Sequence, residues 1–186
     1  MKKTVILFLA LALIMSLCSC GKNKDNLGFT VDSFVAGFNE ANTELEDIDP
    51  EKLSEVDFEE DSKFIKYDFS EYLHYCAYIN PETREVQKMF MWLENDGIED
   101  KTNAYKFAAY NAVMLSCFLE SEEEYSEIVK TLGLDADLEF NTDTLYYNDD
   151  FAAYYSYDVF GYRLLIVTPQ EMEEIEAQAQ SPIVSE

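Results

Sequence analysis

His74 and Cys76 have the most distinctive side-chain chemistry in this 186-residue chain, in which His74 is the single histidine. Residues two positions apart on a strand point to the same face of the sheet, which allows a Cys–His pair for nucleophilic catalysis. Side chains at this spacing lie too far apart for a good direct hydrogen bond, and the sequence offers no evident third group to orient the imidazole. We therefore expect a structural role for His74. Sequence motifs of serine hydrolases, zinc proteases and P-loop enzymes are absent.

Aspartates near predicted turns are the candidates for a metal site. Asp143, Asp149 and Asp150 form an oxygen-rich cluster of the kind that binds calcium weakly in extracellular modules. The acidic run at residues 94–100 fails the register of a calcium loop, because placing its glycine at the sixth position leaves the first and last positions without a carboxylate. A solvated turn explains the cluster more simply in a chain with 38 acidic residues, and we expect no metal.

Aromatic residues are concentrated between residues 146 and 162. Alternation along a strand places Tyr155 and Tyr157 on one face and Tyr154 on the other, so that one set must pack against helices. An exposed set would suit recognition of peptides or sugars. Cross-strand packing in an ordinary sheet is the alternative, and we favour it. The candidates for a binding face are Tyr146, Tyr154, Tyr155, Tyr157 and Tyr162.

The charge balance excludes several classes of partner. The chain has 13 Lys and Arg against 38 Asp and Glu, a formal net charge of −25. Nucleic acid is not an expected partner, because phosphate binding requires basic patches. The same charge opposes adsorption of the domain surface to anionic lipid. Hydrophobic residues make up 48% of the chain, which is enough to bury a core.

The N-terminal segment has the pattern of an export signal. Two lysines precede an uninterrupted apolar run at residues 5–15, which is too short to span a bilayer as a helix. Leu17, Ser19 and Cys20 follow, with the leucine at −3 and a small residue at −1 relative to the cysteine. The segment resembles the signal peptide and lipobox of bacterial lipoproteins, and this resemblance covers only the first 21 residues.

The resemblance implies that Cys20 becomes the acylated N-terminus of the mature protein. Residues 1–19 would be the signal peptide, residues 20–28 a lipidated tether, residues 29–180 a single domain and residues 181–186 a tail. Each buried CH₂ group of an acyl chain contributes about 0.8 kcal/mol, so two or three chains anchor a protein durably. We therefore expect the protein on the extracytoplasmic face of the cell membrane or the outer membrane.

Export also bears on Cys76 and Cys117, the two cysteines of the predicted domain. An oxidising compartment permits a disulfide between them. Cysteine spacing cannot establish contact, however, and two unlinked buried thiols that pack as small hydrophobic groups are the alternative that we favour.

Helical and strand-rich blocks alternate along the chain and must position these residues. Apolar spacing and capping signals predict helices near residues 30–45, 102–119, 122–132 and 170–180. Short apolar and aromatic runs between turn signals predict strands near residues 63–69, 72–79, 86–93, 144–147, 151–157 and 162–168. The predicted fold is α+β, an antiparallel sheet with helices packed on one face, in the order helix, strands, two helices, strands, helix.

Together these features favour a membrane-anchored, non-catalytic binding or interaction lipoprotein without a cofactor. The expected partner is basic or neutral: a cationic peptide, another envelope protein or a glycan. The alternatives are an envelope hydrolase that uses paired carboxylates and a subunit of a larger envelope assembly.

Overall fold

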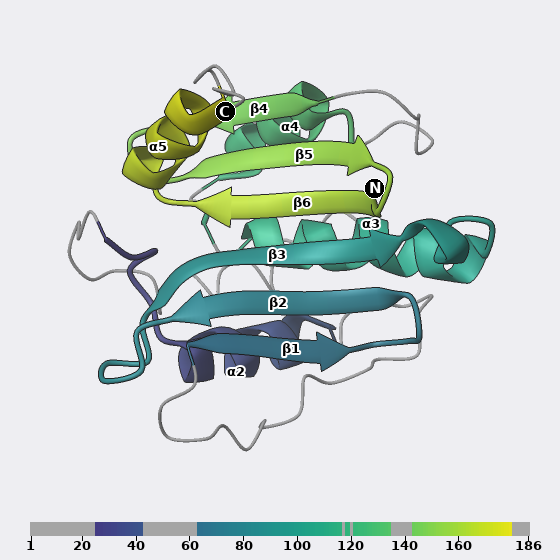
Figure 1. The fold of residues 1–186 in the computed structure, drawn as a ribbon, viewed down its shortest axis with the longest axis horizontal. Helices are drawn as coiled ribbons and strands as arrows, with labels where there is room; N and C mark the ends of the chain where they lie inside the picture. Colours follow the sequence, from purple (N-terminus) through teal and green to yellow (C-terminus); the bar gives the residue numbers. More distant parts are fainter. Residues whose placement is uncertain (1–24, 43–62, 117, 120, 135–142, 180–186) are drawn as a thin grey trace, which may run out of the picture.

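The computed structural model describes residues 25–42, 63–116, 118–119, 121–134 and 143–179 (Figure 1). Its helices are α2 (Val31–Asn42), α3 (Lys101–Ser116), α4 (Glu122–Leu132) and α5 (Pro169–Ala179), with a short 3₁₀ turn η1 (Asn95–Gly97). Its strands are β1 (Phe64–Asp68), β2 (Leu73–Ile79), β3 (Val86–Glu94), β4 (Thr144–Tyr147), β5 (Ala152–Asp158) and β6 (Gly161–Val167). The predicted α+β class and the order of its blocks are confirmed.

The six strands form one antiparallel sheet in the order β1-β2-β3-β6-β5-β4. Two three-stranded meanders, β1–β3 and β4–β6, meet at the centre of the sheet, where β3 pairs with β6 from Lys88↔Val167 to Glu94↔Gly161. One helix, α2 or α4, precedes each meander, and α3 crosses behind the central strands (Figure 1). The sheet is therefore a continuous platform built from two sequence-distant halves.

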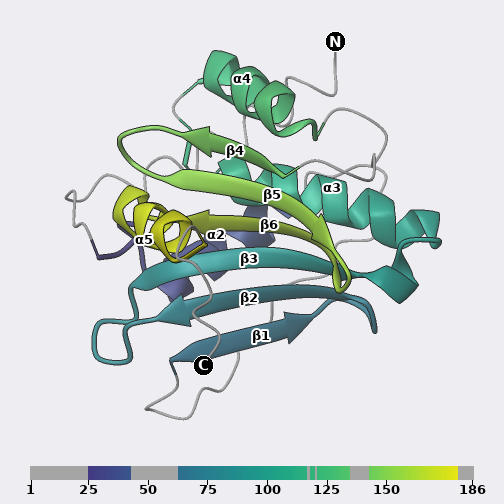
Figure 2. The same cartoon turned by 45° about the horizontal axis from the view of Figure 1, so that its top comes forward.

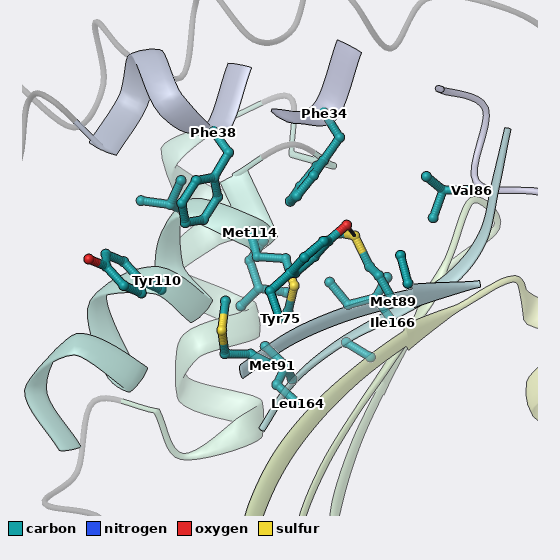
Figure 3. Packing of buried hydrophobic residues seen from close by; sticks show 14 of the residues in the cluster. Phe34, Phe38, Tyr75, Val86, Met89, Met91, Tyr110, Met114, Leu164 and Ile166 are labelled. Atoms are coloured by element: carbon teal, nitrogen blue, oxygen red, sulfur yellow. Dashed lines mark hydrogen bonds between the residues drawn. The ribbon is translucent and has the colours of Figure 1, made fainter. Parts of the chain in front are cut away.

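The main core lies between the sheet and the layer of α2, α3 and α4. Alternate strand residues point into it, and they meet aromatic side chains of the helices (Figure 3). Phe34 of α2 stacks on Tyr75 of β2 with ring centroids 5.1 Å apart, and Phe38 meets Tyr110 of α3 edge-on at 5.6 Å. Full burial of such side chains stabilises the fold by about 1.5–3 kcal/mol each, before packing terms.

Helix α5 departs from the expectation that all helices share one face. Met172 of α5 packs against Ala152 of β5 and Val167 of β6, on the face opposite the main core. Figure 2 shows α5 on the other side of the sheet from α2 and α3. The prediction was wrong here because strand alternation defines two faces without indicating which one a terminal helix covers.

The helix ends follow local capping chemistry. The hydroxyl oxygen of Thr30 accepts a hydrogen bond from the Ser33 N–H at 3.3 Å at the start of α2, and Ser121 accepts one from Glu124 at 3.2 Å at the start of α4. Gly133 ends α4 with a left-handed φ of 70°, and the N–H of Leu134 reaches back to Val129 O at 2.9 Å. The sequence signals for these ends are thus confirmed.

An ion pair connects the β2–β3 turn to α2. The Arg84 guanidinium donates to both carboxylate oxygens of Asp32, at 2.7 and 2.8 Å. These bonds hold the pKa of Asp32 below its ordinary value. The pair is exposed, so its stabilisation is small, below about 1 kcal/mol.

The folded domain begins earlier than the predicted boundary at residue 29. The side-chain amide of Asn26 donates to Glu85 at 3.0 Å, and the N–H of Leu27 donates to Val86 O at 2.7 Å. Asn26 is buried. Residues 26–28 are therefore part of the domain and lie beside the start of β3.

Candidate functional site

Among the described residues, the cover on the face of the sheet opposite the main core is only partial. Helix α5 packs over one end of β5 and β6, and side chains from β1, β2, β3 and β6 line the remainder, which we call the open face. Two of its aromatic side chains, Phe64 and Tyr78, are 40% and 37% exposed. Its other members include Lys66, Asp68, His74, Cys76, Lys88, Phe90, Trp92, Glu94 and Arg163.

His74 lies at the centre of a charged cluster on this face. Its Nδ1 is 2.7 Å from a carboxylate oxygen of Asp68 on β1, and its Nε2 is 2.8 Å from one of Glu94 on β3. The imidazole itself is buried and packs against the Trp92 indole at a centroid distance of 5.2 Å. Each ring nitrogen must carry a proton to donate to an ionised carboxylate, so both bonds form fully with the imidazolium.

This arrangement leaves His74 no ring nitrogen for a substrate. A general base needs a nitrogen that faces the proton it removes, whereas both nitrogens of His74 are already bonded to carboxylates. The three residues lie on adjacent strands, so the cluster joins β1, β2 and β3. The geometry supports the structural role that we expected for this histidine.

Asp68 has a perturbed acidity within the cluster. Partial burial raises its pKa, but hydrogen bonds from Lys66 and His74 outweigh that effect and lower the pKa below its ordinary value. Lys66 lies 3.0 Å from the carboxylate. Asp68 therefore stays ionised at neutral pH and accepts hydrogen bonds from both neighbours.

Cys76 is on the open face but is buried and free. Burial raises the pKa of its thiol to about 12, so the reactive thiolate is scarce at neutral pH. With both nitrogens of His74 engaged elsewhere, the geometry does not support a Cys–His nucleophile. Cys117, the other cysteine of the proposed disulfide, lies outside the described residues.

An aromatic pair dominates the exposed part of the open face. The rings of Phe64 and Tyr78 lie 5.0 Å apart on neighbouring strands. The ammonium of Lys88 sits 4.7 Å above the Tyr78 ring and is bound by Glu171 of α5 at 2.5 Å. Cross-strand and ionic contacts thus fix these rings before any partner binds, which lowers the entropy cost of contact.

The structure divides the candidate tyrosines between the two faces of the sheet. Tyr155 and Tyr162 are buried in the main core, with their rings stacked at a centroid distance of 5.9 Å. Tyr146 and Tyr157 are half-buried against the same core. Tyr154 is on the opposite face, where burial and a hydrogen bond with Asp143 raise its pKa to about 12. The five residues do not form one surface.

The acidic candidates for metal binding do not converge. Among residues 25–42, 63–134 and 143–179, where described, no group of three or more His, Cys, Asp and Glu side chains is arranged to hold a metal ion. Asp143 pairs with Tyr154, and Asp149 and Asp150 are exposed in the turn before β5. That turn is closed by Asn148, whose side-chain oxygen accepts the N–H groups of residues 150 and 151 at 2.9 and 2.8 Å.

The predicted acylation site, Cys20, lies outside the described residues, as do the rest of the signal segment and the C-terminal tail. Within the described part of the chain, no helix combines the length and apolar character needed to cross a bilayer.

Sequence reasoning missed the carboxylate partners of His74 and the role of the open face. The partners are 6 and 20 positions away in sequence and meet through strand register. The β2–β3 turn does not predict this arrangement, because the register shifts between Tyr78 and Ile79. Counting back from the pair Ile79↔Val86 would place Met91 opposite His74, whereas the structure places Trp92 there.

No protein-family model, curated protein sequence or solved structure matches this chain.

Proposed function

We propose that the protein is an exported, lipid-anchored component of the bacterial cell envelope that binds a partner without performing chemistry. The leucine, serine and cysteine at positions 17, 19 and 20 support the anchor. The partner is basic or neutral, because the chain carries a net charge of −25. An envelope protein is the partner class that we favour over a free cationic peptide or a glycan, since the open face combines exposed aromatic side chains with charges that are already paired.

The binding surface in this proposal is the open face, and the single observation that carries it is the Phe64–Tyr78 pair. Large aromatic side chains that are 40% and 37% exposed on a sheet, and held by neighbouring contacts, are typical of interface anchors. The charges around them are already paired with one another, as in Lys66–Asp68 and Lys88–Glu171. A partner therefore gains apolar contact without leaving a desolvated, unpaired charge.

The test compares envelope partners of three forms of the full-length protein after mild chemical crosslinking in cells. The forms are the parent, the double variant Phe64→Ser/Tyr78→Ser, and the control Tyr105→Ser. Tyr105 is 52% exposed but lies on α3, in the layer opposite the open face. We expect the double variant to lose its crosslinked partner, and the control to retain it. Equal recovery from all three forms would contradict the proposal.

A further inference from the structure

The link between β5 and β6 carries the most exposed large hydrophobic side chains among the described residues. Val159 is 80% exposed and Phe160 is 64% exposed, and together they form the two-residue tip of the hairpin. Two-residue hairpin links normally use glycine, asparagine or aspartate, which suit both solvent and turn geometry. Two bulky apolar residues in this position need an explanation beyond turn formation.

The tip is held rigidly although its side chains are exposed. Trp92 Nε1 donates to Phe160 O at 3.1 Å, and the Asn95 side-chain amide donates to Val159 O at 2.9 Å. The N–H of Phe160 donates to the Asp158 carboxylate at 2.8 Å. Gly161 then follows with φ of 129° and no room for a Cβ atom. The backbone that carries the two apolar side chains is therefore held in one conformation, which lowers the entropy cost of docking.

The surroundings of the tip are acidic. Residues 94–101, which include the Asn95 anchor, contain four carboxylates and one lysine. Glu71, Asp96 and Glu94 lie close enough to Tyr72 to raise the pKa of its hydroxyl, which places them together at this end of the sheet. Figure 1 shows the β5–β6 link at the same end as the β3–α3 connection. An apolar tip thus projects beside a concentration of negative charge.

We propose that the Val159–Phe160 tip docks a cationic, amphipathic segment of a partner protein. The two side chains enter an apolar depression of that segment, and its lysines or arginines face the carboxylates of residues 94–100. Charge complementarity selects this occupant over an anionic lipid surface, which the same carboxylates repel. The inference rests on the proposed function as an interaction protein. It adds the Val159–Phe160 tip as a second contact point, separate from the open face.

The test measures binding of a fluorescent synthetic helix of lysine and leucine to the full-length protein in phosphatidylcholine nanodiscs. A matched helix with glutamate in place of lysine is the charge control. The variants are Val159→Ser/Phe160→Ser and, as an apolar control elsewhere, Ile175→Ser on α5, which is 36% exposed. We expect the tip variant to bind the lysine helix about tenfold more weakly, in line with loss of an apolar anchor, and the control to bind within about twofold of the parent.

Raising the salt concentration from about 50 mM to about 500 mM should also weaken the parent complex. Unchanged binding by the tip variant, or equal binding of the glutamate helix, would overturn the inference. Tip-dependent binding to phosphatidylglycerol vesicles without binding to the lysine helix would overturn it in favour of a lipid contact. If the tip inference fails in one of these ways while crosslinking in cells still depends on Phe64 and Tyr78, the proposed function is unaffected.

Discussion

His74 connects three strands through two charged hydrogen bonds, and its contribution to stability is separable from that of the aromatic core. Asp68 comes from β1 and Glu94 from the end of β3, at 2.7 and 2.8 Å from the two ring nitrogens. Hydrogen bonds to charged groups stabilise by roughly 1.5–3 kcal/mol each when they are removed from bulk water. Asp68 is largely exposed, so the hydrogen bond between His74 and Asp68 stabilises the fold by less than that range.

His74→Leu should lower the free energy of unfolding by about 2 kcal/mol, because two carboxylates lose their common donor. It should also raise the pKa of Asp68 toward its ordinary value, since His74 is one of the two donors that lower it. Urea denaturation and an NMR titration of the carboxyl carbon measure the two effects. Asp68→Asn should lower the free energy of unfolding less in the His74→Leu variant than in the parent protein. Equal losses in the two backgrounds would contradict an energetic coupling between His74 and Asp68.

Asn111 on α3 is a buried amide for which the described residues provide no hydrogen-bond partner. It is fully buried, and neither its Nδ2 nor its Oδ1 has a hydrogen-bond partner within the described part of the chain. Asn111→Leu should therefore raise the free energy of unfolding by about 1–3 kcal/mol, measured by urea denaturation. The matched control is Asn103→Leu on the same helix, which should destabilise because Asn103 accepts a bond from Ser70 at 3.1 Å. A loss of stability in both variants would show that Asn111 is satisfied.

At the scale of elements, the β5–β6 link requires glycine at position 161. A Cβ atom at Gly161 would lie 2.0 Å from Leu93 O, with φ at 129°. Gly161→Ala should therefore destabilise the protein by more than about 2 kcal/mol, through clash and backbone strain. Gly133 has a φ of 70° and open space around it, so Gly133→Ala should lower the free energy of unfolding by only about 1 kcal/mol. Thermal unfolding compares the two, and similar losses would argue against the tight anchoring of the tip.

Local sequence signals predicted most of the elements because the relevant interactions are local. The caps at Thr30 and Ser121 and the glycine at the end of α4 act within one turn of a helix. The β2–β3 hairpin follows from a turn that Asn80 closes through its side-chain oxygen. Each of these contacts joins residues close in the chain, so one sequence is sufficient to anticipate them.

The candidate site was harder to predict because it depends on contacts between distant strands. Pairing of β3 with β6 brings Trp92 opposite Arg163, and no local pattern specifies that neighbour. The tyrosine-rich stretch was visible in the sequence, but alternation alone did not reveal that Tyr155 faces the main core. The side of the sheet that α5 covers was likewise undetermined, and it decides which aromatic residues remain exposed.

At the scale of the whole molecule, the excess of acidic groups should produce a stability maximum in mild acid. With 38 acidic and 13 basic residues, the folded surface is under mutual repulsion at neutral pH. Partial protonation relieves that repulsion, so the melting temperature should be higher at about pH 5 than at about pH 7.

The melting temperature should fall again below about pH 4. Asp32 and Asp68 have lowered pKa values in the folded state, so their stabilisation is complete above the unfolded-state pKa and is lost as pH falls through the folded value. Calorimetry across this range measures both limbs. A melting temperature that only decreases from neutral pH downward would contradict the repulsion argument and indicate that specific ion pairs dominate.

The central claim, that this is a lipid-anchored envelope protein, is tested most directly by labelling cells with radioactive palmitate. Label should enter the parent protein and be lost in Cys20→Ala, while Cys18→Ala keeps it, because only Cys20 has an apolar residue at −3 and a small residue at −1. The domain should also leave its lipid anchorage, although uncleaved precursor can remain in the membrane fraction. Label that persists in Cys20→Ala and disappears in Cys18→Ala would show that Cys18 is the acylated residue. Absence of label from the parent protein would contradict the claim that the protein is lipid-anchored.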